Sequence, residues 1–245
     1  MFQLFSFNSE ELLPYIDWVH FFHAWQVKQG TSEAEELRSD ALSLLKGKGI
    51  SEAAKGIFRE VEAHSEGDNL FIEDVCLPLL RQQTKNEEGT TLCLSDFVSP
   101  KGSNIGIFAT SSHIASDNMT TEGDPYEKLL LQTLSTRLAE AAAEKLQSLT
   151  MSGIRPAVGY PCMPDLSIIF ILNQLCPLDE IGVKLTENGA MIPQASVSGL
   201  IIPHPLAHYF AVGHIGEDQF NDYALRRGME PDRMKKFFKN TDNKP

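Results

Sequence analysis

The spacing of hydrophobic positions predicts three long helices in this chain. Apolar side chains recur every three or four positions in residues 32–46 and again in 51–65, with a glycine-rich break at 47–49 and Ser51 as a candidate N-cap of the second helix. Residues 124–149 show the same period and begin with an Asp-Pro pair, which suits an N-cap and a first helical position. Their apolar stripe consists of Leu130, Leu134, Leu138 and Ala141.

Shorter apolar runs predict strands between and after these helices. The runs at 70–80 and 90–98 flank a turn sequence at 86–89, so we expect them to form an antiparallel hairpin. Residues 105–110 are apolar on both faces, as in a central strand. The other predicted strands are residues 181–187, 196–202 and 209–215, and the other predicted helices are residues 15–25, 165–175, 216–228 and 232–239.

These elements predict an α+β fold in which a twisted antiparallel sheet is flanked by helices. We expect residues 1–69 to be mainly helical and residues 70–239 to supply the sheet and further helices, all within one domain spanning residues 1–245. Within the sheet, residues 209–215 are expected to pair back on residues 199–202.

Composition restricts the possible partners. The formal net charge of −12 argues against a nucleic-acid-binding protein, which normally presents a basic face. The four cysteines form neither a CxxC pair nor a zinc-ligand spacing, which favours reduced thiols and a cytoplasmic protein. No apolar run approaches the ~18 residues of a membrane helix, and the apolar start of the chain is too short for a signal peptide.

Residues 152–164 combine three prolines and two glycines with one arginine and one tyrosine. Proline fixes φ and removes a backbone donor, whereas glycine lets the backbone approach a partner closely. The segment is therefore predicted to be a rigid loop, neither a helix nor a regular strand, that holds Arg155 and Tyr160 in place. A simple connector between two elements is an alternative that composition leaves open.

The order of residues in this loop is more specific than its composition. Residues 155–161, Arg-Pro-Ala-Val-Gly-Tyr-Pro, resemble the RPAxGYP motif of the S-adenosylmethionine-binding activation domain of cobalamin-dependent methionine synthase. Further segments that resemble this family follow in the same order: residues 15–18, 79–83, 94–101, 137–140, 184–187, 195–199 and 204–209. The resemblance implies the α+β fold of that activation domain, here as a stand-alone protein.

The resemblance also implies a set of S-adenosylmethionine (AdoMet) binding positions: Asp17, Glu140, Arg155, Ala157, Gly159, Tyr160 and Tyr209. By its chemistry, Arg155 suits bidentate binding of the ligand carboxylate, and Asp17 or Glu140 suits binding of the ligand amine. Backbone groups of the alanine and glycine could reach the adenine or ribose, and the two tyrosines could stack on the ligand or hydrogen-bond to it.

Several of these side chains also have a purely structural explanation. Asp17 could cap a helix, Glu140 could pair with Arg137 one turn away, and Tyr209 could be a buried ring with a satisfied hydroxyl. His20 and a second histidine three residues later suggest a metal, but no third ligand follows at a useful spacing. No metal ligand and no catalytic residue is predicted.

The resemblance implies a role in reactivation: in this family, inactive cob(II)alamin is reduced by one electron and remethylated from AdoMet. Residues 1–245 contain no Asp-x-His-x-x-Gly cobalamin motif. We therefore expect cobalamin on a partner, either a cobalamin-binding methionine synthase subunit or a related corrinoid protein. The electron is expected from a donor such as a flavodoxin-like protein.

Reactivation is the favoured function, and two departures from the family pattern leave alternatives to it open. The acidic helical insert that precedes the loop in the family is absent, and Leu166 stands where the family usually carries a histidine. The alternatives are a non-catalytic AdoMet-binding regulatory or sensor protein, and an accessory module of another corrinoid methyltransferase.

Overall fold

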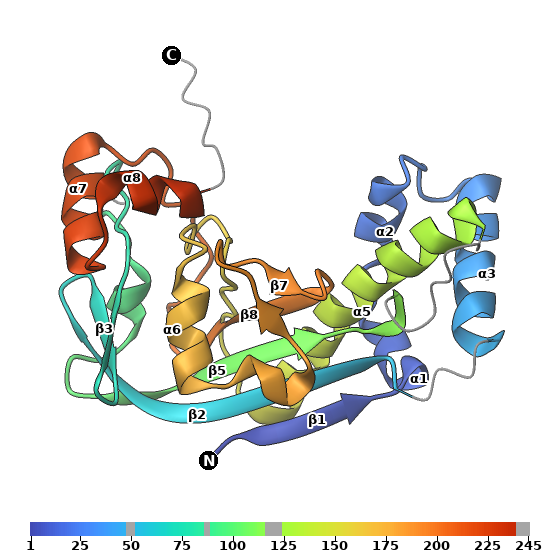
Figure 1. Ribbon diagram of the computed structural model, residues 1–245, viewed down its shortest axis with the longest axis horizontal. Helices are drawn as coiled ribbons and strands as arrows, with labels where there is room; N and C mark the ends of the chain where they lie inside the picture. Colours follow the sequence, from blue (N-terminus) through green and yellow to red (C-terminus); the bar gives the residue numbers. More distant parts are fainter. Residues whose placement is uncertain (48–51, 86–88, 116–123, 239–245) are drawn as a thin grey trace.

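A strongly curved antiparallel sheet organises the chain (Figure 1). The computed structural model describes residues 1–47, 52–85, 89–115 and 124–238. The longest strand, β2 (Ala54–Glu66), pairs along one edge with β5 (Ser103–Ser111). Its other edge is shared by β1 (Gln3–Phe7) at the start of the strand and β3 (Asn69–Ile72) at its end.

Two further strands complete the sheet, giving the order β4-β3-β2-β5-β8 with β1 beside β2. They are β4 (Val75–Pro78) and β8 (Ser196–Ile201), and a separate small sheet pairs β6 (Lys184–Leu185) with β7 (Met191–Ile192). Because β8 pairs with β5 along one edge, its other edge is left for the residues that follow the longest helix.

The helices gather at the two ends of this sheet and over both of its faces (Figure 1). At one end lie α1 (Ser9–Leu12), the 3₁₀ turn η1 (Leu13–Tyr15), α2 (Trp18–Ala24), α3 (Ser32–Gly47) and the long α5 (Pro125–Thr150). The other helices are α6 (Ile168–Leu175), η3 (Leu178–Ile181), α7 (Glu217–Arg226), α8 (Pro231–Met234) and η4 (Lys235–Phe237).

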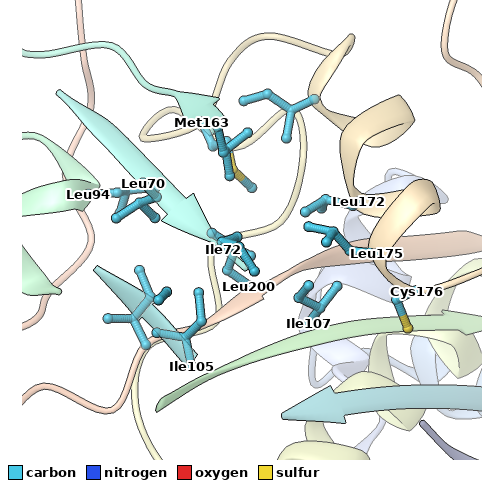
Figure 2. Close-up of a cluster of buried hydrophobic side chains, with 14 of the residues drawn as sticks. Leu70, Ile72, Leu94, Ile105, Ile107, Met163, Leu172, Leu175, Cys176 and Leu200 are labelled. Atoms are coloured by element: carbon cyan, nitrogen blue, oxygen red, sulfur yellow. The ribbon is translucent and has the colours of Figure 1, made fainter. Parts of the chain in front are cut away.

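Both faces of the sheet are buried, which explains why residues 105–109 of its central strand are apolar on both faces. On β5, Ile107 belongs to the core that contains α6, whereas its neighbour Phe108 belongs to the core that contains α5. Figure 2 shows the first core, where Leu172 of α6 lies with Ile107 and with Leu200 of β8. The predicted α+β class is confirmed, as are the central strand and the long helix that begins after the Asp124 cap.

Residues 51–65 were expected to be helical, and that prediction is wrong. From Ala54 onward they form β2, and Ser51 lies outside the described residues. Strand pairing on both edges satisfies the backbone of β2, and this tertiary pairing overrides the helix preference of its Ala, Glu and Lys residues. Residues 1–69 thus supply β1 and β2 to the sheet in addition to the helices that were expected there.

The predicted hairpin between residues 70–80 and 90–98 is also wrong. The chain reverses at Glu73, which has φ of 53°, so β3 and β4 pair with each other instead. Residues 94–97 form a 3₁₀ turn because Asp96 accepts a hydrogen bond from the Cys93 amide at 2.8 Å and binds Arg81. Part of the expected turn, residues 86–88, lies outside the described residues.

A buried polar cluster joins α7 to the segment that precedes α6. The fully buried Asp165 accepts hydrogen bonds from the Tyr223 hydroxyl at 2.7 Å and from the Ser167 hydroxyl at 2.8 Å. The Arg227 Nε atom lies 3.3 Å from the same carboxylate. Burial, reinforced by the charge of Asp165, raises the pKa of the Tyr223 phenol well above its ordinary value. The phenol therefore stays neutral and keeps donating.

Replacing Tyr223 with phenylalanine should lower the free energy of unfolding by about 2 kcal/mol, because a buried hydrogen bond to a charged group is lost. Tyr126→Phe is the matched control, since its hydroxyl also donates to a carboxylate, that of Asp40, at 2.7 Å but on the exposed surface. We expect that control to cost less than about 0.5 kcal/mol. Urea denaturation measures both, and equal losses would contradict a special role for the buried cluster.

Candidate functional site

Residues 152–164 form a rigid loop along the free edge of β8. The Leu200 amide donates to the Pro156 carbonyl at 3.0 Å, and the Val158 amide donates to the Ser198 carbonyl at 2.9 Å. Proline has no N–H, so the pairing remains a set of isolated bridges and does not continue as a strand. The loop predicted from the prolines is thus confirmed.

The prediction that residues 209–215 pair with residues 199–202 is wrong, because the loop already occupies that edge of β8. Residues 209–215 instead run outside the loop, where the Val212 amide donates to the Pro161 carbonyl at 2.9 Å. This arrangement brings Tyr209 next to the loop: its hydroxyl accepts a hydrogen bond from the Arg155 amide at 2.9 Å.

A tight turn in the middle of the loop presents Tyr160. The Tyr160 amide donates to the Ala157 carbonyl at 3.0 Å, and the Gly159 amide donates to the Met163 carbonyl at 2.9 Å. Gly159 has φ of 89°, a conformation that favours glycine. These backbone groups of Ala157 and Gly159 are therefore engaged within the loop itself.

Beside this turn lies a cavity of about 380 Å³ whose wall carries several charged side chains. It is lined by Tyr15, Asp17, His20, Arg137, Glu140, Glu144, Arg155 and Tyr160. Three of these come from α5, where spacings of three and four residues put side chains on the same helix face. The cavity thus lies between α5, the start of α2 and the loop.

Arg155 is an enclosed cation of this cavity, with only 13% of its side chain exposed. Its Nε donates to Gln147 Oε1 at 3.2 Å, and its guanidinium carbon lies 5.4 Å from the centre of the Phe108 ring. Its Nη1 is buried and has no hydrogen-bond partner among the described residues. The Glu140 Oε2 atom is 4.0 Å from this nitrogen, which is too far for a hydrogen bond. Within the described part of the chain, this donor is therefore unsatisfied.

Asp17 caps α2 and also lines the cavity. Its Oδ1 accepts from the His20 amide at 3.0 Å, and its Oδ2 lies 2.5 Å from Nδ1 of the His20 ring. The backbone hydrogen bond from His20, with smaller contributions from the ring, lowers the pKa of the Asp17 carboxyl. The carboxylate is therefore anionic at neutral pH. Asp17 thus has both the predicted capping role and a position in the cavity wall.

The two predicted tyrosines lie near each other, with ring centres 6.4 Å apart. Tyr160 is half-buried, and burial first, then the negative charge of Glu140, raises the pKa of its phenol. Tyr209 is 54% exposed, so the alternative of a buried ring is wrong, although its hydroxyl is satisfied by the Arg155 amide. One ring thus borders the cavity while the other faces solvent beside it.

Three other properties concern the residues that the structure describes: metal binding, membrane insertion and thiol reactivity. There, no group of three or more His, Cys, Asp or Glu side chains is placed to hold a metal ion. Nor does any described helix have the length and apolar character needed to cross a bilayer. Burial raises the pKa of the Cys93 and Cys162 thiols to about 11, which makes them poor nucleophiles.

Two comparisons with known proteins identify the family. A family model described as vitamin B12 dependent methionine synthase, activation domain, matches residues 8–151 and 146–228. The chain belongs to this family. The fold of this chain is also similar to a crystal structure of the MetH reactivation domain bound to AdoHcy, with a TM-score of 0.87 and 30% sequence identity. The match covers 97% of this chain and 89% of that chain. The resemblance seen in the sequence and the predicted fold class are confirmed.

In this activation domain, four of the seven predicted binding residues line one cavity: Asp17, Glu140, Arg155 and Tyr160. Tyr209 contacts the backbone of Arg155 beside it, whereas Ala157 and Gly159 build the turn. Sequence reasoning did not place Tyr15, His20, Arg137 or Glu144 in a ligand site. The signal was available for two of them, because Arg137 and Glu144 lie three and four residues from Glu140 on a predicted helix.

Proposed function

We propose that this chain binds AdoMet in the cavity beside the loop and supports the reductive remethylation of cob(II)alamin on a cobalamin-dependent methionine synthase partner. Two findings support the proposal: membership of the activation-domain family and likeness to a reactivation domain whose crystal structure contains AdoHcy. Under this proposal a separate reductant supplies the electron, and the protein works in the cytoplasm.

One observation carries the binding proposal: at the cavity, the buried Nη1 of Arg155 finds no acceptor among the described residues. A buried donor without a partner costs free energy, and a ligand carboxylate that accepts its hydrogen bond recovers that cost. A guanidinium also suits a carboxylate geometrically, because its donors form a planar fork. AdoMet carries such a carboxylate on its amino acid part.

The remaining charges of the cavity suit the other end of that amino acid part. Asp17 and Glu140 both line the cavity, and either carboxylate suits the ligand ammonium group. The Glu140 side chain is 34% exposed and too far from the Arg155 Nη1 atom to hydrogen-bond to it. Tyr160 offers an aromatic face to the sulfonium, an attraction of about 0.5–2 kcal/mol. The cavity can thus hold the ligand by both charges of its amino acid part.

The proposed chemistry needs positioning more than acid–base catalysis. Cobalamin, when delivered by the partner, supplies the reduced metal that accepts the methyl group. In this proposal the residues of this chain hold the amino acid part of AdoMet, so that its methyl group is positioned for transfer to the partner's cofactor. A nearby carboxylate such as Glu140 also balances the ligand's positive charge before transfer.

Isothermal titration with AdoMet tests the binding step, and remethylation of partner-bound cob(II)alamin by this chain and a chemical reductant tests the reaction. Binding without remethylation would favour the sensor or regulatory alternative. Absence of AdoMet binding at high protein concentration would overturn the proposal as a whole.

Replacing Glu140 with glutamine should weaken AdoMet binding about fivefold, because one of the two carboxylates proposed to bind the ligand ammonium loses its charge. Glu187→Gln is the matched control, since this side chain is exposed and lies outside the cavity. Titration calorimetry at pH 7.5 compares the two. An unchanged dissociation constant in Glu140→Gln would assign the ammonium to Asp17 alone.

A further inference from the structure

His20 lies in the cavity wall and binds Asp17, one of the two carboxylates proposed to bind the ligand amine. Its ring Nδ1 is 2.5 Å from Asp17 Oδ2, while its backbone amide binds the other oxygen of that carboxylate. Both oxygens of Asp17 are therefore engaged before any ligand arrives. His20 itself is 70% exposed at the side chain, so its ring is accessible to solvent protons.

We propose that His20 sets the affinity of the cavity for AdoMet by competing with the ligand ammonium group for Asp17, so that binding weakens as the solution becomes acidic. This inference rests on the proposed AdoMet-binding function. An imidazolium and an ammonium are alternative cationic partners for one carboxylate, whereas a neutral imidazole is the weaker competitor. His20 is a positioning residue in this account, because it acts through Asp17.

The other titratable and charged groups that line the cavity with His20 come from its own helix and from three neighbouring segments. They are Asp17 on the same helix, Tyr15 on η1, Arg137, Glu140 and Glu144 on α5, and Arg155 and Tyr160 on the loop. Two further cations lie over aromatic rings near this end of the molecule: Arg38 of α3 over Trp18, and Lys145 of α5 over Tyr15. None of these groups is a histidine, and imidazole is the side chain that ordinarily changes charge between pH 5 and 8.

The direction of the pH effect depends on which form of the protein, free or ligand-bound, is stabilised by protonated His20 and which by neutral His20. Protonated His20 favours the free protein, because the imidazolium stabilises its pair with Asp17. The bound ammonium favours neutral His20, because two cations would otherwise share one carboxylate. Binding of AdoMet in mildly acidic solution should therefore release protons, and the dissociation constant should rise as the pH falls.

Titration calorimetry with AdoMet at pH 5.5, 6.5 and 7.5 tests this inference. For the natural chain we expect the dissociation constant to rise about threefold between pH 7.5 and 5.5, a size typical of an exposed ion pair. His20→Asn keeps a donor near the Nδ1 position but does not titrate, and its dissociation constant should change less than about 1.5-fold over the same range. Repeating the pH 6 titration in buffers of different ionisation enthalpy measures proton release.

His23→Asn is the matched control, because this histidine lies one turn along α2 and is not part of the cavity wall. It should keep the pH dependence of the natural chain. AdoHcy, which has the same ammonium but no sulfonium, should show that pH dependence too. A dependence seen with AdoMet alone would assign the effect to the sulfonium and overturn the competition for Asp17.

The outcomes separate this inference from the proposed function. Binding of AdoMet with an affinity that does not vary with pH, or that varies equally in His20→Asn, overturns the role of His20 and leaves the proposed function intact. Absence of AdoMet binding at every pH overturns the proposed function, and the inference about His20 with it.

Discussion

Replacing Arg155 with alanine should weaken AdoMet binding about 100-fold, which corresponds to about 2.8 kcal/mol. The guanidinium is buried against Phe108 and Gln147, and its Nη1 has no hydrogen-bond partner within the part of the chain that the structure describes. A ligand carboxylate that accepts from this nitrogen makes charge-assisted hydrogen bonds that alanine cannot replace. Titration calorimetry at pH 7.5 measures the loss.

Two further variants separate recognition of the ligand from maintenance of the fold. Arg155→Lys retains the charge but not the planar fork, so it should recover only part of the lost affinity and remain about tenfold weaker than the natural chain. Arg233→Ala removes an exposed arginine from α8 and should leave AdoMet affinity unchanged. If Arg155→Ala bound AdoMet within twofold of the natural chain while keeping its thermal midpoint, the binding proposal would fail.

Replacing Gly199 with alanine should lower the free energy of unfolding by about 3 kcal/mol and weaken AdoMet binding together. A Cβ atom at this position would lie 2.1 Å from the Pro156 carbonyl oxygen and 2.7 Å from the Ala157 Cα atom. Both obstacles are backbone, so β8 and the loop would have to separate, and Arg155 and Tyr160 would move with the loop. Thermal unfolding and calorimetry on the same preparation measure both effects.

A second glycine distinguishes steric conflict from the general cost of losing a glycine. Gly30 has φ of 84°, and a Cβ atom added there would meet no atom of the described residues within 4 Å. Gly30→Ala should therefore cost only the strain of a left-handed backbone, about 1–2 kcal/mol, and leave AdoMet affinity unaffected. Normal ligand affinity in Gly199→Ala would show that the loop tolerates displacement from β8, contrary to our account of how the site is held.

Sequence predicted those parts of the site whose backbone conformation is set by residues adjacent in the chain. The prolines and glycines of residues 152–164 indicated a rigid loop, and the Asp-Pro pair before α5 indicated where that helix begins. Both predictions depend on the backbone preferences of a few adjacent residues, and these preferences are the same whatever the rest of the fold. The capping role of Asp17 was foreseen for the same reason, whereas its pairing with the His20 ring was not.

The secondary-structure predictions were wrong where pairing with residues distant in the chain determines the backbone conformation. Residues 54–66 have a composition that suits a helix, yet β1 and β5 pair with them from both sides and make them the longest strand of the sheet. Residues 209–215 have an apolar pattern that suits a strand, yet the loop takes the edge of β8 that they would need. Neither competition between partners is visible in a single stretch of sequence.

Residue order was enough to specify the α+β class, the position of the rigid loop, the helix that carries Glu140 and the family to which the chain belongs. These properties depend on interactions between near neighbours and on motifs. Three-dimensional packing was needed to show that Asp17, Glu140 and Arg155 share one cavity and that the His20 ring lies against Asp17 at its wall. It also showed that, among the described residues, nothing accepts a hydrogen bond from the buried Nη1 of Arg155. Asp17 is more than a hundred residues from Glu140 and Arg155 along the chain. Only the packing of α2 on α5, and of α5 and the loop on the sheet, brings these side chains together.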